Sequence, residues 1–304
     1  MSGTPSRCGV VAVIGAPNAG KSTLVNALVG QKVAITSAKA QTTRARMLGI
    51  ALAKNEDAAT QMILVDTPGI FAPRRKLDRA MVSAAWDGAE AADAVLLLVD
   101  PVKQRRHELE PLIEALAGRP ERKILVLNKV DAAKKEPLLA LAQELGEKTD
   151  FAEVFFVSAL TGDGVVEMKQ ALADMMPEGV WHYPEDQVSD ASERLLAAEV
   201  TREQLYKQLH EELPYDSAVR PESYQQRPDG SLEIHQQIVI ARESQRPIVL
   251  GKGGRMIKAI GEAARKELAE MLGVKVHLFL HVKVEEGWAE SKEVYEEMGL
   301  DWVK

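Results

Sequence analysis

The sequence predicts two domains in tandem: an α/β domain with a doubly wound, mostly parallel sheet, and then a smaller α+β domain. In residues 8–178, short apolar runs alternate with helical patterns, which is typical of a parallel sheet with helices on both faces. From residue 191 the order changes to helix, hairpin, helix, strand. Over residues 179–190 the periodicity is lost and Pro184 lies among polar residues, which indicates a linker.

The strands of the first domain are predicted from apolar runs with the length and composition of buried parallel strands. These runs lie at residues 10–14, 62–65, 95–99, 124–127 and 154–157. A helix should follow Ser22, with Leu24, Ala27 and Leu28 on its inner face. Since open α/β sheets bind ligands at the carboxyl ends of their strands, motifs that follow these runs should lie together.

The second domain is predicted to open with a helix over residues 192–212, stopped by Pro214. Strands over 216–225 and 231–241 flank an Asp-Gly turn. Apolar residues at three- and four-residue steps predict a helix over 255–272, and strict alternation predicts a strand over 274–284. The expected divisions are a first domain at 8–178, a linker at 179–190, a second domain at 191–287, and an acidic tail at 288–304. We expect the tail to be a solvated helical cap, with a partner contact as the alternative.

The composition argues against a membrane-spanning or secreted protein and against a fold held together by disulfides. No uncharged stretch approaches the roughly 18 residues that a membrane helix needs, and the first residues have no apolar signal region. The single cysteine, Cys8, cannot build a disulfide framework, which fits a reducing compartment. Cys8 is expected to be a buried thiol beside a strand.

The first motif is GAPNAGKS at residues 15–22, which fits the phosphate-loop pattern G-x-x-x-x-G-K-[ST]. Glycines let backbone N–H groups surround a phosphate at a helix N-terminus. The Lys21 ammonium should reach the β- and γ-phosphates, and the Ser22 hydroxyl should bind Mg²⁺. The predicted phosphate-binding residues are Gly15, Ala16, Pro17, Asn18, Ala19, Gly20, Lys21, Ser22 and Thr23. This pattern by itself is equally typical of ATPases and kinases.

The second motif, DTPG, ends the strand predicted at residues 62–65. The Asp66 carboxylate can hold the magnesium shell through water, and the Gly69 N–H can meet the γ-phosphate. The predicted nucleotide-binding residues here are Asp66, Thr67, Pro68, Gly69 and Ile70.

The motif NKVD at residues 128–131 predicts the base. Guanine presents N1–H and N2–H₂ donors on one edge, and the Asp131 carboxylate can accept both, whereas adenine would leave it unpaired. Such a site rejects the wrong base by about 10⁴ or more. Asn128 should support the loop and face the O6/N7 side of the base. The remaining predicted residues of this pocket are Lys129 and, from the motif SAL, Ser158, Ala159 and Leu160, with the Ala159 N–H toward O6.

A G-x-x-G loop at residues 251–254 lies between two helical segments of the second domain. The domain is acidic, because residues 181–304 contain 16 Lys+Arg and 23 Asp+Glu, yet no acid lies between Glu243 and Glu262. Glycines leave room for a sugar-phosphate backbone, lysine attracts it, and a helix N-terminus points N–H groups at it. The predicted RNA-binding residues are Gly251, Lys252, Gly253, Gly254, Arg255 and Lys258.

Together with KAQTTR at residues 39–44, these motifs resemble the Era family of bacterial GTPases, over about residues 8–287. The resemblance implies a phosphate-loop GTPase domain followed by a type II KH domain. It places Gln41 to Arg44 in the first switch, with Thr43 favoured over Thr42 as the magnesium ligand. Its implied catalytic residues are Lys21, Thr43 and Gly69.

The resemblance also bears on the rate of hydrolysis. Ile70 stands where Ras-like proteins have a water-orienting glutamine, so hydrolysis should be slow. GTPases of this kind with an asparagine at position 18 are similar to ones activated by K⁺, which stands where an arginine finger would put its charge. Arg74, Arg75 or Lys76 could supply an arginine-finger charge from within the chain. We favour the alternative that these residues belong to a solvated switch loop.

The resemblance further implies a monomeric, cytoplasmic ribosome-assembly factor that hydrolyses GTP. Its KH domain would bind the single-stranded 3′ end of 16S rRNA in the 30S subunit, and not DNA. Peripheral association with the cytoplasmic side of the inner membrane stays open. Two other hypotheses are a small-molecule kinase, against which Asp131 and DTPG argue, and a GTPase whose KH-like domain binds protein.

Overall fold

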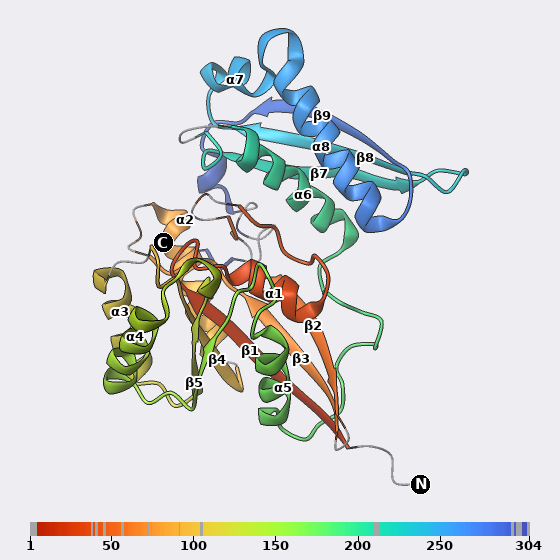
Figure 1. The fold of residues 1–304 in the computed structure, drawn as a ribbon. Helices are drawn as coiled ribbons and strands as arrows, with labels where there is room; N and C mark the ends of the chain where they lie inside the picture. Colours follow the sequence, from red (N-terminus) through yellow and green to blue (C-terminus); the bar gives the residue numbers. More distant parts are fainter. Residues whose placement is uncertain are drawn as a thin grey trace. The chain divides into compact units, whose positions relative to one another are not determined.

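The structure is a computed structural model, and it describes residues 5–302 except 38, 40–41, 45–46, 56–57, 72, 74, 91, 104–105, 210–212, 293–294 and 296–299. The chain divides into two compact units, which are drawn in Figure 1. The first contains Met1–Ala34, Thr43–Asp190 and Met298–Lys304, and the second contains Ile35–Thr42 and Ala191–Glu297. No helix in the described part of the chain is long and apolar enough to cross a membrane.

The first unit is built on a six-stranded sheet with the order β2-β3-β1-β4-β5-β6. All neighbours are parallel except β2 and β3, which confirms the predicted mostly parallel α/β fold. Strand β2 was not predicted from the sequence. The strands are β1 (Ser6–Gly15), β2 (Met47–Lys54), β3 (Ala59–Asp66), β4 (Ala94–Val99), β5 (Arg122–Leu127) and β6 (Glu153–Phe156).

Two cores lie on opposite faces of this sheet, because successive strand side chains point to opposite sides. Val11 and Val13 pack in the core that contains residues of α1 and α5, whereas Ala12 and Ile14 pack in the core that contains residues of α3 and α4. The helices are α1 (Lys21–Val29), α2 (Lys76–Glu90), α3 (Arg106–Ala117), α4 (Lys135–Lys148) and α5 (Val165–Met175).

Strand β6 differs from the prediction of a buried strand. It pairs only with β5, and Val154 and Phe156 are each 37% exposed. The prediction of burial was wrong for these two residues, because an edge strand of a parallel sheet can be as apolar as a central one. Val157, the last residue of the run, is buried as predicted. Cys8, by contrast, is a buried free thiol in β1, as predicted.

The second unit has a three-stranded sheet with the order β7-β8-β9, antiparallel between β7 and β8 and parallel between β8 and β9. Residues of α6 and α8 pack with those of the sheet in its two apolar clusters (Figure 1). The elements are α6 (Glu193–Gln208), β7 (Ser217–Gln226), β8 (Leu232–Ile240), α7 (Arg246–Leu250), α8 (Arg255–Leu272) and β9 (Val276–Val284).

Helix α8 has the predicted bounds, and the ends of the three strands lie within two residues of the predicted ones. Helix α6 was predicted to reach residue 212 but ends at Gln208. Leu209 has an extended backbone there, and its side chain is buried in the core of the second unit. Burial of this side chain therefore stabilises the end of the helix at Gln208.

Residues 179–190, predicted as a linker, run along the first unit and are hydrogen-bonded to it. Gly179 N donates to Ser6 O, Gln61 Nε2 donates to Tyr183 O, and Ile50 N donates to Val188 O. Most of the tail beyond residue 292 lies outside the described residues. At its start, the buried Trp288 donates from Nε1 to Asp216 O, at 3.1 Å.

Candidate nucleotide and RNA sites

The phosphate loop connects β1 to α1 through residues with positive φ. Gly15 has φ +152°, Asn18 has φ +64° and Gly20 has φ +101°. Gly20 is the N-cap of α1 and has no side chain to cap it, so the N–H groups of the first turn, which includes Thr23, can meet an anion. A Cβ at Gly20 would lie 2.3 Å from Asn128 Nδ2, which explains the glycine.

Lys21 is buried inside this loop and donates hydrogen bonds from Nζ to Gly15 O, at 3.2 Å, and to Ala16 O, at 3.0 Å. Burial lowers the pKa of Lys21 to about 8, although the Asp66 carboxylate acts in the opposite direction. A lysine held by the carbonyls of this loop, next to the N-terminus of α1, suits a phosphate chain.

Three oxygen side chains meet beside the loop. Ser22 Oγ lies 2.6 Å from Asp66 Oδ2 and 2.9 Å from Thr43 Oγ1, and Thr43 Oγ1 lies 3.4 Å from Asp66 Oδ2. Asp66 is fully buried, and its Oδ1 is without a hydrogen-bond partner among the described residues. Burial raises the pKa of Asp66 to about 6, against the Ser22 hydrogen bond and the Lys21 charge, which lower it. One buried carboxylate with two hydroxyls fits a hard divalent cation such as Mg²⁺.

The Thr42 hydroxyl instead donates to Lys39 O, at 2.9 Å. The cluster with Ser22 and Asp66 therefore contains Thr43, the threonine that the sequence analysis favoured. Gln41 and Arg74 lie outside the described residues. Arg75 faces Asp78. The side-chain Nε of Arg75 lies 3.6 Å from Asp78 Oδ1, and its backbone N–H donates to Asp78 Oδ2 at 2.9 Å.

The DTPG segment packs against the phosphate loop. The Thr67 hydroxyl donates to Val13 O at 2.7 Å, and Ile70 N donates to Gly15 O at 3.0 Å. Pro68, which follows Thr67 in the sequence, is also buried. A Cβ at Gly69 would lie 2.8 Å from Pro17 N, so only glycine allows the two backbones to approach this closely.

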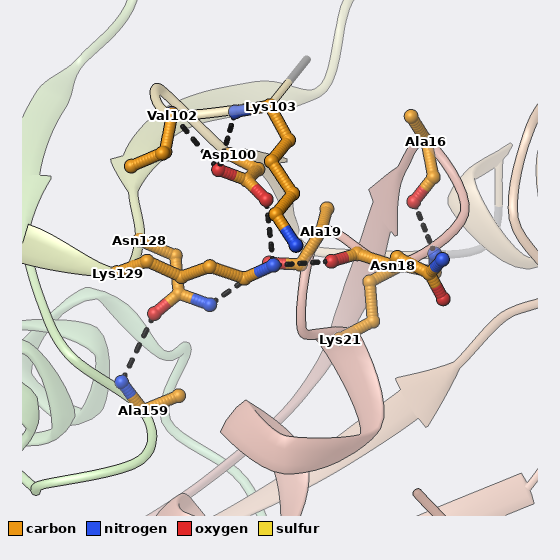
Figure 2. A network of polar contacts seen from close by, with 10 residues as sticks. All are labelled: Ala16, Asn18, Ala19, Lys21, Asp100, Val102, Lys103, Asn128, Lys129 and Ala159. Carbon is orange, nitrogen blue, oxygen red and sulfur yellow. Dashed lines mark hydrogen bonds and ion pairs between the residues drawn. The ribbon is translucent and has the colours of Figure 1, made fainter. Parts of the chain in front are cut away.

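Asn128 joins the two motifs predicted to bind the base to the phosphate loop (Figure 2). Its Nδ2 donates to Ala19 O at 2.8 Å, and its Oδ1 accepts a hydrogen bond from Ala159 N at 3.0 Å. Asn128 is buried, so these bonds hold three segments in a fixed relation.

Lys129, which has φ +62°, extends across the phosphate loop. Its Nζ donates to Asn18 O at 2.7 Å and pairs with Asp100 Oδ2 at 2.6 Å (Figure 2). Asp100 Oδ1 accepts from Val102 N and Lys103 N. Asp100 was not predicted as a site residue, although its place at the carboxyl end of β4 was a usable signal.

The remaining residues predicted for the base pocket lie at the surface or on a tight turn. Asp131 is exposed in the 3₁₀ helix Val130–Ala132, which follows β5. Ser158 is buried, and its Oγ accepts from Thr161 N at 3.2 Å, whereas Leu160 is 80% exposed. An exposed carboxylate next to an ordered loop is available to a base.

The G-x-x-G loop of the second unit separates α7 from α8. Gly251, Gly253 and Gly254 all have positive φ, of +69°, +63° and +75°. A Cβ at Gly251 would lie 2.8 Å from Met256 N, whereas one at Gly253 or Gly254 would meet open space. Lys252 is exposed. The loop therefore presents bare backbone and a cation at the N-terminus of α8.

A groove of about 310 Å³ lies between α8, the helix that follows the G-x-x-G loop, and the edge strand β9. Its apolar lining includes Ile257 and Leu278, and its charged side chains are Lys258, Arg265 and the acidic Glu262. Apolar and basic side chains in one groove suit unstacked bases and their phosphates, whereas Glu262 would repel a phosphate next to it. Arg255, exposed in the first turn of α8, is not part of this lining.

The fold and the nucleotide pocket define a phosphate-loop GTPase joined to a KH domain. A family model described as a 50S ribosome-binding GTPase matches residues 10–129, and one described as a KH domain matches residues 212–289. The chain is 86% identical to GTPase Era of Erythrobacter litoralis over 299 residues, 98% of each protein. It is 56% identical to GTPase Era of a Bradyrhizobium species over 300 residues, 99% of this chain and 96% of the relative. The chain therefore belongs to the Era family of GTPases.

Two solved structures resemble the whole chain. One is Era in complex with MgGDPNP and nucleotides 1506–1542 of 16S ribosomal RNA, with a TM-score of 0.90, 36% identity, and coverage of 97% of this chain and 99% of that one. The other is an Aquifex aeolicus Era variant bound to GDP and AlF₄⁻, with a TM-score of 0.87, 36% identity, and coverage of 96% and 99%. The kinase hypothesis is not supported by these relatives.

Proposed function

We propose that this GTPase acts in assembly of the 30S ribosomal subunit and that its KH domain binds the single-stranded 3′ end of 16S rRNA. The observation that carries the proposal is the G-x-x-G loop, with three left-handed glycines and an exposed lysine at the N-terminus of α8. The similar Era structure that contains nucleotides of 16S rRNA supports the choice of RNA.

In the nucleotide site, we assign the predicted residues to three roles. The phosphate loop binds the phosphates with its N–H groups and Lys21. Asp131 reads guanine, and Asn128 supports the loop. The Ala159 N–H donates to Asn128 Oδ1 in the structure, so it would have to exchange that bond to meet O6 of the base. Ser22, Thr43 and Asp66 would hold Mg²⁺, which neutralises charge on the β- and γ-phosphates when it is bound. The support for the last role is the buried, unpartnered Asp66 Oδ1 and the MgGDPNP in a similar Era structure.

We also assign Asn18 to a K⁺ site. Ile70 packs with the apolar core and has no polar group to orient water. Arg75 contacts Asp78 at the start of α2. A monovalent cation near the phosphates would supply the charge that an arginine finger supplies elsewhere. Asn18 has a left-handed backbone conformation in the phosphate loop, and its backbone carbonyl accepts a hydrogen bond from Lys129 Nζ.

RNA binding is tested by replacing Lys252 and Gly253 with aspartates. Two carboxylates would then face phosphates, and Gly251 and Gly254 would keep the turn. Aspartate tolerates the φ of +63° at position 253, and its Cβ meets open space. A labelled single-stranded RNA matching the ribosomal 3′ end should bind the wild type and lose binding to this variant, whereas GTP binding should be unchanged.

The matched control places the same two substitutions at the other end of α8, as Gly273→Asp and Lys275→Asp. Gly273 has φ +66° and open space at Cβ, and Lys275 is exposed. The control changes charge and composition identically, so it should retain RNA binding. Wild-type affinity should fall with salt, with a slope of roughly −0.7 per phosphate contacted, and duplex DNA should bind poorly. RNA binding by the Lys252/Gly253 variant that equals the control's would refute the assignment of this loop.

The cellular place that fits this function is the cytoplasm, where small subunits assemble. Monomeric behaviour and peripheral association with the inner membrane rest on the family resemblance alone.

A further inference from the structure

Asp100 directly follows β4 and is buried where that strand ends. Its Oδ1 accepts hydrogen bonds from Val102 N at 2.9 Å and from Lys103 N at 3.1 Å, which fix the carboxylate on the turn that it begins. Its Oδ2 lies 2.6 Å from Lys129 Nζ (Figure 2). One oxygen is therefore used by the local turn, and the other pairs with a residue of the NKVD motif.

Lys129 connects Asp100 to the phosphate loop, because its Nζ also donates to Asn18 O at 2.7 Å. The preceding residue, Asn128, donates from Nδ2 to Ala19 O at 2.8 Å. Consecutive residues of the NKVD motif thus bond to consecutive carbonyls of the phosphate loop. Asn128 is buried, whereas the Lys129 side chain is 34% exposed. The flexible lysine can therefore turn to solvent once the Asp100 carboxylate is removed.

The backbone of Lys129 also bears on the turn predicted to bind the base. Its φ of +62° lies in the left-handed region, which costs free energy for a residue with a side chain. Lys129 is the N-cap of the 3₁₀ helix Val130–Ala132, and Ala132 N donates to Lys129 O at 3.0 Å. An anchored Lys129 side chain therefore helps to hold the turn that presents Asp131.

We propose that Asp100 is a positioning residue for guanine-nucleotide binding, which acts by holding Lys129 across the phosphate loop. The inference rests on the proposed roles of the phosphate loop and Asp131. It accounts for a buried carboxylate close to a site for phosphates, since the lysine compensates its charge at 2.6 Å. Asp100 contributes order to the loop and the turn, and this order should slow the release of GDP.

The test measures the dissociation rate of fluorescently labelled GDP from Asp100→Asn, Lys129→Met and the variant that carries both. In Asp100→Asn the amide oxygen can still accept from Val102 N and Lys103 N, so the turn is kept while the ion pair is lost. GDP should dissociate about tenfold faster, the effect of one lost charge-assisted hydrogen bond. A change of charge alone has the opposite sign, because removing a carboxylate near an anion slows the release of that anion. The direction of the change therefore separates positioning from electrostatics.

The double variant tests the route of the effect. If Asp100 acts through Lys129, GDP should leave the double variant at the same rate as it leaves Lys129→Met. Release from the double variant that is threefold faster than from Lys129→Met would overturn the inference. Rates within twofold of the wild type for Asp100→Asn or for Lys129→Met would overturn it as well.

Asp93→Asn is the matched control, because Asp93 directly precedes the same strand and its Oδ2 accepts from Val10 N at 2.8 Å. It should release GDP at the wild-type rate, and an acceleration equal to that of Asp100→Asn would count against the proposal. Thermal unfolding establishes that each variant is folded. Asp100→Ser takes the place of Asp100→Asn should the latter not fold, since a serine hydroxyl can cap the same turn without the charge. A wild type that binds ADP as tightly as GDP would instead contradict the proposed nucleotide site.

Discussion

The Ser22 hydroxyl donates a hydrogen bond of 2.6 Å to Asp66 Oδ2 and so joins the phosphate loop to the end of β3. The other carboxylate oxygen, Asp66 Oδ1, is buried without a hydrogen-bond partner among the described residues. Burying an ionised carboxylate is costly unless its charge is compensated. The buried Asp66 carboxylate therefore lowers the stability of the fold, and a divalent cation bound to it would compensate its charge.

Mg²⁺ binding should depend on pH through Asp66. Burial raises its pKa to about 6, and a metal ligand must be deprotonated. Mg²⁺ affinity should be constant above about pH 7 and fall by about tenfold per pH unit well below 6. Titration of Mg²⁺ into the GDP-bound protein, followed by fluorescence of a labelled nucleotide, measures this. An affinity that stays constant down to pH 5 would contradict it.

Asp66→Asn should stabilise the metal-free protein at pH 8 while abolishing Mg²⁺ binding. A carboxyl whose pKa is raised on folding stabilises the fold when protonated, and this contribution is lost as pH rises through about 6. The variant does not lose this contribution. The difference in free energy of unfolding between the variant and the wild type should therefore grow from pH 4 to pH 7 by up to about 3 kcal/mol. Urea unfolding at the two pH values measures it. The exposed Asp163→Asn serves as a control that should show no such trend.

Asp131→Asn should exchange guanine for xanthine, whose C2 oxygen can accept a hydrogen bond from the new amide. Asp131 is exposed beside the loop that Asn128 holds in place, so the substitution should leave that loop intact. Binding of GDP and XDP by calorimetry tests the assignment. Undiminished GDP affinity in this variant would show that another residue reads the base.

GTP hydrolysis should be faster in K⁺ than in Na⁺ at equal ionic strength. Unassisted Ras-like hydrolysis runs on the order of 10⁻⁴ s⁻¹, so a charge near the transferred phosphoryl group has room to act. Asn18→Ala should lose the response. Asn18→Gly, which tolerates φ of +64° without strain, separates loss of the side chain from backbone strain. Equal wild-type rates in the two salts would exclude a K⁺ site.

The nucleotide motifs could be identified from the sequence because each is a local pattern after an apolar strand. Contacts between distant residues, such as Arg202 with Thr42 or Lys129 with Asp100, depend on the tertiary fold and leave no local pattern. Strand β2 is a further case. Its Gly49 weakens the strand signal, yet a Cβ there would lie 2.9 Å from Val25 Cγ1 of α1, so close packing requires glycine.

The path of residues 188–190 has a consequence for solubility. Strand β2 lies at one edge of the six-stranded sheet, and an open strand edge can recruit strands from other molecules. Here Ile50 N donates to Val188 O at 2.8 Å and Ser189 Oγ donates to Leu48 O at 2.8 Å. The connection between the units thereby covers that edge at Leu48–Ile50. Shortening or rerouting it would expose a template for edge-to-edge aggregation.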